Sequence, residues 1–160
     1  FFARSLGITL TDQRSSVKIN RDNERNHQVI AGDLKTEKVR AKVGEWLKSE
    51  PVDLIIERMV GGLVLAPKNP YLIAYYLSHW YSVLSERGIM LVQAPDFTRK
   101  LTIPWMEHVK ASSGRTIDIS YDGRDDDLYN TLRIQKLPGS PAQIPLLSPR
   151  QVKQAYRKTV

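Results

Sequence analysis

Four short runs of mostly apolar residues recur along the chain and are separated by longer, more polar segments. Short apolar runs are typical of β-strands, and runs with almost no polar residues suit strands buried on both faces, as in a parallel sheet. Strands that alternate with helices indicate an open α/β sheet with right-handed crossovers. The runs are Leu6 to Thr11, Gln28 to Ala31, Val52 to Ile56 and Ile89 to Gln93.

Three other segments place apolar residues at helical spacing. Thr36 is a candidate N-cap for the first of them. Asn69 and Pro70 resemble an N-cap and a first helical residue for the second, and Gly88 is predicted to follow its last turn. The third is shorter and ends before Gly114. The chain therefore alternates predicted strands and helices over most of its length.

The C-terminal third has a different pattern. Residues 117–121 and 131–135 alternate between apolar and polar residues on either side of a polar connection, which predicts an antiparallel hairpin. A proline-rich stretch follows, and Ser148 with Pro149 predict a last helix whose charges are all basic. The expected fold is thus an α/β fold. It has an open, mostly parallel, doubly wound sheet with helices on both faces and a C-terminal antiparallel hairpin.

The composition excludes several classes of protein. The length of 160 residues suits one domain. Cysteine is absent, which excludes disulfides, thiolate metal sites and cysteine nucleophiles. No apolar run approaches the ~20 residues that span a bilayer, so we expect a cytoplasmic protein without a membrane partner. Lys and Arg outnumber Asp and Glu by 24 to 17, a net charge of +7. This surplus favours nucleic acid as a partner, although a solvated basic surface explains it equally well.

Polar residues follow three of the predicted strands. Asp12 ends the first, Gly32 and Asp33 end the second, and Glu57 and Arg58 end the third. Ligands of open α/β sheets bind outside the carboxyl ends of the strands. A carboxylate can accept hydrogen bonds from both hydroxyls of a vicinal diol, and a glycine allows a ligand to approach the backbone closely. These residues are therefore candidates for a binding site.

In this order, the segments resemble the class I methyltransferases that use S-adenosylmethionine, from the second strand of that family onward. GITLTD, VIAGDL and VDLIIERMVGG are similar to its second, third and fourth strands, and LSHWYSVLSERGIMLVQAP is similar to the stretch through its fifth. The resemblance implies a Rossmann-like domain over residues 1–137, followed by a proline-rich segment and short basic helix over 138–160. It also implies S-adenosylmethionine as the cofactor and methyl transfer to an acceptor that the sequence does not identify. The implied cofactor-binding residues are Asp12 at the ribose, Gly32, Asp33 and Leu34 at the adenine, and Glu57 and Arg58 at the end of the fourth strand.

One element of the family lies outside the sequence. The first strand and its glycine-rich loop would precede Phe1. That strand lies between the family's second and fourth strands, so we expect the 160 residues to be a fragment or an inactive form that does not form the family's continuous sheet alone. Either another chain or segment fills the gap, or the two halves of the sheet pair directly. The first two runs should pair in parallel, and so should the third and fourth, with the hairpin beyond them.

Each candidate residue also has a purely structural interpretation. Asp12 can begin a turn, Gly32 and Asp33 can form an ordinary strand exit, and Glu57 can pair with Arg58. No catalytic residue is indicated. The three histidines lack the spacing of metal ligands, so no metal site is predicted.

Other classes of function are less well supported. The motifs of kinases, P-loop NTPases and serine hydrolases are absent. A nicotinamide-binding domain would share the ribose-binding Asp. The main alternative is a non-catalytic Rossmann-like module that binds nucleic acid or a protein partner. The sequence does not indicate an oligomeric state.

Overall fold

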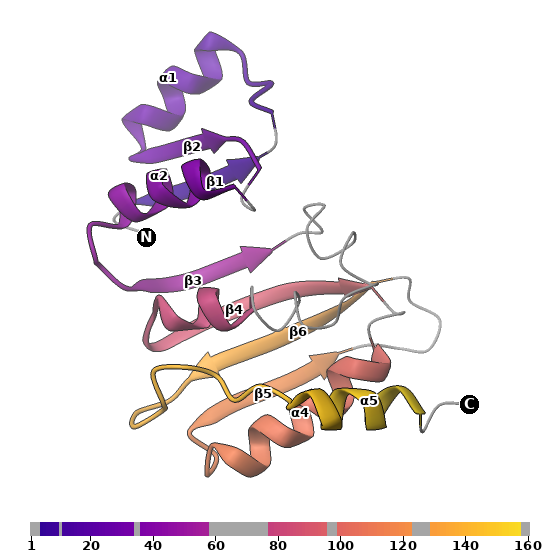
Figure 1. Cartoon of the computed structure of the whole chain (residues 1–160). Helices are drawn as coiled ribbons and strands as arrows, with labels where there is room; N and C mark the ends of the chain where they lie inside the picture. The colour runs from indigo at the N-terminus through magenta and orange to yellow at the C-terminus, as the bar shows by residue number, and fades with distance from the viewer. Residues whose placement is uncertain are drawn as a thin grey trace. The chain divides into compact units, whose positions relative to one another are not determined.

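A computed structural model describes residues 4–9, 11–33, 36–57, 77–95, 99–122 and 129–157. The chain divides into two compact units, Phe1–Glu50 and Pro51–Val160, and each is described here by itself (Figure 1). The boundary expected at residue 137 falls inside the second unit and stays a prediction. Among the described residues, no helix combines the length and apolar character needed to cross a bilayer.

The first unit is a pair of strand–helix repeats. β1 and β2 pair in parallel, with Ser5 opposite His27 and Thr9 opposite Ala31. This confirms the parallel pairing expected of the first two runs. The elements in chain order are β1 (Ser5–Thr9), α1 (Ser16–Glu24), β2 (His27–Ala31) and α2 (Glu37–Leu47).

The sequence pattern did not indicate helix α1. It begins after Ser15, whose hydroxyl accepts a hydrogen bond from the backbone N–H of Lys18 at 3.4 Å. No residue of α1 is buried, so the helix has no apolar stripe that periodicity could detect. The cap at Ser15 was the available signal, since serine is a preferred N-cap residue.

Helix α2 begins after Thr36, as the sequence predicts, but the Thr36 side chain does not cap the helix. Thr36 occupies the N-cap position without a side-chain bond to the helix, and its hydroxyl donates instead to the carbonyl of Asp33 at 2.7 Å. Val39 is the buried residue of the helix and lies in the small core of this unit with Ile30. The helix ends at Lys48, which has a left-handed conformation.

The second unit contains a mixed four-stranded sheet in the order β3-β4-β6-β5. β3 and β4 are parallel, whereas β6 pairs antiparallel with both β4 and β5. The parallel neighbours and the hairpin beyond them are thus confirmed. Figure 1 shows α4 and α5 beside the β5 side of this sheet. The bounds are β3 (Val52–Glu57), β4 (Leu84–Pro95), α4 (Arg99–Ser112), β5 (Ile117–Asp122), β6 (Tyr129–Lys136) and α5 (Pro149–Arg157).

The core of the second unit lies between this sheet and the helices, and apolar side chains of α4 and of three strands fill it. Trp105 joins this core to the proline-rich segment, because its indole N–H donates to the carbonyl of Pro145 at 2.8 Å. Fully buried apolar side chains include Tyr81, Leu77, Met90, Ile119, Leu132, Ile134, Val92 and Val109.

The prediction that a helix ends just before Gly88 is wrong, because Gly88 lies within strand β4. The first part of that segment lies outside the described residues, residues 77–82 are helical, and β4 already begins at Leu84. A Cβ atom on Gly88 would lie 2.9 Å from the carbonyl oxygens of both Ser85 and Val52. The ladder between β3 and β4 shifts register at this point. Gly88 therefore marks an irregularity inside a strand and not the end of a helix.

A single, mostly parallel, doubly wound sheet does not form among the described residues. They form a two-stranded parallel sheet and a mixed four-stranded one. Both expected ways of joining the two halves, direct pairing and a strand supplied by another chain or segment, stay predictions. β3 is an outer strand of its sheet, and Ile56 is 59% exposed instead of buried as expected.

Candidate functional site

Asp12 lies three residues beyond the end of β1 at Thr9, and Arg14 holds its carboxylate. Its Oδ1 accepts the backbone N–H of Arg14 at 3.1 Å and Nε at 2.9 Å, and its Oδ2 accepts Nη2 at 2.7 Å. These hydrogen bonds lower the pKa of the Asp12 carboxyl to about 2. These contacts are compatible with the structural interpretation of Asp12 as a turn residue, and the carboxylate is ionised at neutral pH.

Arg14 also connects this turn to helix α1. Its Nη1 donates to Oδ2 of Asp22 at 2.8 Å. Hydrogen bonding to Arg14 lowers the pKa of Asp22, and the two carboxylates together raise the pKa of the guanidinium. The turn after β1 is thus fixed to α1 through one arginine between two carboxylates.

Gly32 and Asp33 leave β2 beside the exit from β1. The backbone N–H of Gly32 donates to the carbonyl of Thr9 at 2.7 Å, which extends the parallel ladder by one bond. The structure therefore brings Asp12, Gly32 and Asp33 to the same carboxyl edge of this sheet, as the sequence predicts. Leu34 lies outside the described residues.

Packing against α2 explains the glycine at position 32. Its φ angle is +143°, and an added Cβ would lie 2.5 Å from Cγ2 of Val39. The next residue turns into α2, since the carbonyl of Asp33 accepts the backbone N–H of Thr36 at 2.9 Å. These contacts thus explain why glycine occupies position 32 without reference to a ligand.

Glu57 ends β3 in the second unit. It is buried, with 8% of its surface exposed, and lies opposite Val92 in the ladder to β4. Arg58 lies outside the described residues, so its pairing with Glu57 stays a prediction. The predicted binding residues therefore form two groups, one on each unit.

Sequence reasoning missed a buried polar residue, Asn130, at the same end of the second sheet. Asn130 is 2% exposed and lies opposite Ala94, near the carboxyl end of β4. Its Nδ2 donates to the hydroxyl of Tyr121 at 2.8 Å. The sequence places Asn130 in the polar connection of the predicted hairpin, directly before the run 131–135.

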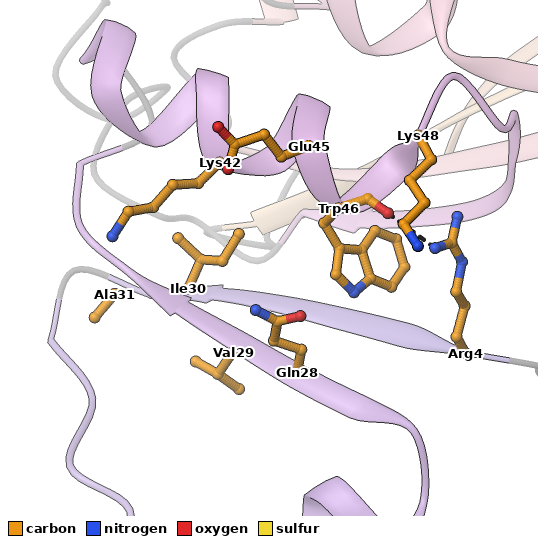
Figure 2. Close-up of a pocket in the computed structure, with 9 residues that line it drawn as sticks. All are labelled: Arg4, Gln28, Val29, Ile30, Ala31, Lys42, Glu45, Trp46 and Lys48. Atoms are coloured by element: carbon orange, nitrogen blue, oxygen red, sulfur yellow. Dashed lines mark hydrogen bonds between the residues drawn. The ribbon is translucent and has the colours of Figure 1, made fainter.

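An open cavity of about 720 Å³ lies in the first unit, between α2 and the free side of β2 (Figure 2). Its walls are residues 28–31 of β2 and the side chains of Lys42, Glu45 and Trp46, with Arg4 and Lys48 at one end. We call it the α2 groove. Of the predicted cofactor-binding residues that the structure describes in this unit, Asp12, Gly32 and Asp33, none lines it.

Metal binding has no support in the described part of the chain. No group of three His, Asp or Glu side chains there is arranged to hold an ion. The absence of a metal site stays a prediction for the whole protein.

Comparison with known proteins identifies the fold. The sequence matches no family model and no curated protein. A structure from Plasmodium falciparum, described as a ribosomal RNA methyltransferase, aligns with a TM-score of 0.53 at 12% identity over 86% of this chain and 74% of that one. This likeness gives the chain an α/β fold of the kind found in a methyltransferase.

Two bacterial structures described as rRNA methylases align less closely. One, from Streptococcus thermophilus, has a TM-score of 0.48 at 12% identity and covers 84% of this chain and 87% of that one. The other, from Clostridium thermocellum, has a TM-score of 0.46 at 13% identity and covers 84% and 89%. The fold assignment rests on the first structure alone.

Proposed function

We propose that the chain is part of a class I methyltransferase that uses S-adenosylmethionine and transfers its methyl group to an acceptor not yet identified. The main support is that Asp12 and the Gly32–Asp33 pair meet at one carboxyl edge of β1 and β2, where ligands of such sheets bind. The mostly parallel doubly wound sheet belongs to this proposal. The likeness in fold to a methyltransferase structure is the second support.

In the first unit, the contacts between Asp12 and Arg14 determine how many ribose hydroxyls Asp12 can bind. A carboxylate has about four acceptor positions, and Arg14 uses three of those on Asp12. One position on Oδ2 remains, so Asp12 can accept one ribose hydroxyl while Arg14 stays in place. A bond to both hydroxyls requires Arg14 to move.

The remaining candidates have more limited roles in the proposal. Gly32, Asp33 and Leu34 would lie beside the adenine, and Glu57 and Arg58 at the end of the strand that carries them. When bound, S-adenosylmethionine supplies a methyl group on a sulfonium that a nucleophile can displace. The protein then mainly positions the two reactants and excludes water. No side chain in the described part of the chain is assigned as a catalytic base.

The second candidate function is a non-catalytic module that binds nucleic acid or a protein. The net charge of +7 supports it, as do the cationic side chains around the α2 groove. A steep fall of affinity with salt would favour nucleic acid as the partner. Negligible affinity for RNA and DNA at low salt would contradict it.

The proposed function is tested by isothermal titration with S-adenosylmethionine and with its demethylated product, using the full-length protein. We expect saturable binding that Asp12→Asn weakens. Glu24→Gln is the matched control, because Glu24 is an exposed carboxylate on α1 of the same unit. No binding at millimolar ligand would contradict the proposal, and so would equal losses in the two variants.

A further inference from the structure

The α2 groove has the size of a ligand site, and its lining ends at Ala31, directly before the predicted cofactor residues Gly32 and Asp33. Its volume of about 720 Å³ is within the range of small-molecule pockets, about 300–1,000 Å³. One wall consists of four consecutive residues of β2, which is an outer strand because only β1 pairs with it in the described part of the chain. The groove is open to solvent.

Arg4 holds the indole of Trp46 in place within the groove. Its guanidinium carbon lies 4.4 Å from the centroid of the Trp46 ring. The same guanidinium donates to the carbonyls of Trp46 at 2.8 Å and Leu47 at 2.9 Å, and it pairs with Glu50. Cation and ring are thus fixed to the C-terminal end of α2, so little side-chain freedom is left to lose on binding.

Two further cations flank the indole. Figure 2 shows Lys42 on one side of Trp46 and Lys48 on the other. Both lysines are exposed, and neither ammonium group has a partner among the described residues. One carboxylate, that of Glu45, also belongs to the wall. The groove therefore presents a fixed aromatic ring between two available positive charges.

We propose that the α2 groove binds a single-stranded segment of nucleic acid. Phosphates would lie at Lys42 and Lys48, and a base between them would stack on Trp46. Grooves that hold single strands combine cations along the backbone with aromatic rings under the bases. The amide of Gln28, next to the indole in Figure 2, can donate to and accept from a base edge.

The arrangement favours a strand over other anionic ligands. Cations on both sides of the ring suit a ligand whose negative charge repeats, whereas a mononucleotide needs only one of them. A duplex keeps its base faces stacked and cannot offer one to Trp46. An acidic peptide could match the charges but has no obligatory planar group for the indole. This inference does not depend on the proposed methyl transfer.

The test measures fluorescence anisotropy of a labelled single-stranded RNA decamer of mixed sequence, titrated with the full-length protein without S-adenosylmethionine. The double variant K42Q/K48Q should reduce the slope of log K against log salt by about 1.4, since each phosphate contact on a single strand contributes about 0.7. Trp46→Leu should weaken binding about five- to hundredfold, as loss of one stacked base does. Trp46→Phe should retain most of the affinity.

Two variants with opposite expectations make the test specific to the groove. Glu45→Gln removes the carboxylate from the wall and should strengthen binding about two- to fivefold. Lys18→Gln makes the same charge change as each groove lysine on exposed helix α1, and it should leave affinity nearly unchanged. Circular dichroism of each variant checks that the fold is retained.

The contradicting outcomes are equally specific. Equal losses in Lys18→Gln and in the groove lysines would show general charge attraction and overturn the site. Equal affinity for a duplex of the same sequence, for uridine monophosphate or for an acidic decapeptide would overturn the single-stranded ligand. If the parent protein binds S-adenosylmethionine but not the RNA decamer, this inference is rejected and the proposed methyl transfer is not.

Discussion

Arg14 donates to both carboxylate oxygens of Asp12, and the same guanidinium reaches Asp22 on α1. Asp12, which the sequence suggests for ribose binding, is therefore already part of a local ion-pair network centred on Arg14. Asp12 keeps one acceptor position on Oδ2 while this network is intact. Arg14 thus determines how Asp12 can contact a ligand.

The first prediction concerns the pKa of Asp12. Arg14→Gln should return it from about 2 towards the ordinary value of 3.8, because hydrogen bonds from Arg14 are the main cause of the shift. A carboxyl whose pKa is lowered by folding adds stability above its unfolded pKa, and this stability is lost as the pH falls through the folded value. The parent should therefore lose its advantage over Arg14→Gln between about pH 4 and about pH 2. Carbon-detected NMR titration and thermal unfolding at each pH measure the two effects.

The second prediction links this network to ligand binding. Asp12→Ala and Asp33→Ala should each weaken S-adenosylmethionine binding about tenfold to hundredfold with the fold intact, as expected for a lost hydrogen bond to a charged group. Arg14→Gln should strengthen binding by up to about fivefold, because it frees acceptor positions on Asp12. Isothermal titration measures all three variants.

The double variant separates the two roles of Arg14. If Arg14 acts only through Asp12, Arg14→Gln should have no effect in the Asp12→Ala background. If both alanine variants bind as the parent does, the assignment of the site is wrong even though the fold is retained.

Backbone features near the predicted site could be inferred from the sequence, but their contacts could not. The parallel pairing of the first two runs, and with it the placement of Asp12 and Gly32 beyond the same end of the sheet, follows from apolar runs that end in polar residues. The Asp12–Arg14–Asp22 network required helix α1, which buries no residue and so leaves no apolar period in the sequence. Surface helices of this kind are specified by their caps and connections more than by burial.

The role of Gly88 likewise could not be predicted from the sequence. Gly88 is followed by a strand-like run and preceded by a helical one, which is typical of a helix end. Its actual role depends on the carbonyl of Val52, a residue far away in sequence that only the β3–β4 ladder brings close. The groove residues Arg4 and Trp46 likewise meet through tertiary structure, because 42 positions separate them.

The third prediction tests the structural role of Gly32 with Gly44 as its matched control. Gly32→Ala should lower the free energy of unfolding by at least about 1–3 kcal/mol, because its φ is positive and its Cβ would overlap Val39. Gly44→Ala should raise it by up to about 1 kcal/mol, since Gly44 lies within α2 with no atom within 4 Å of an added Cβ. Urea unfolding of both variants measures the difference.

A second substitution divides the cost of Gly32→Ala. In the Gly32→Ala background, the substitution Val39→Ala removes Cγ2 and with it the overlap, and it leaves the backbone strain at position 32. Stability equal to that of Val39→Ala alone would mean that the strain costs nothing. If Gly32→Ala proves neutral, the close packing of α2 on the exit from β2 is incorrect.

The last prediction concerns Lys136, a lysine buried at the end of β6. It is 8% exposed, its Nζ donates to the carbonyl of Leu84 at 2.8 Å, and it lies 4.7 Å from the ring centroid of Tyr81. Burial lowers its pKa below the ordinary 10.5. Because the folded lysine releases its proton at a lower pH than the unfolded one, the unfolded state binds more protons between the two values, and stability rises with pH across that window.

Lys136→Met removes this titration while it keeps an unbranched side chain of similar length. The stability of the parent relative to Lys136→Met should therefore increase as the pH is raised towards the ordinary lysine pKa of 10.5. Tyr81 is present in both proteins, so its own ionisation, which burial shifts to higher pH by raising its pKa, contributes to both unfolding curves. Urea unfolding at several pH values gives the difference directly. A difference that stays constant or falls with pH would mean that the ammonium group is not held in the buried position beside Leu84 and Tyr81.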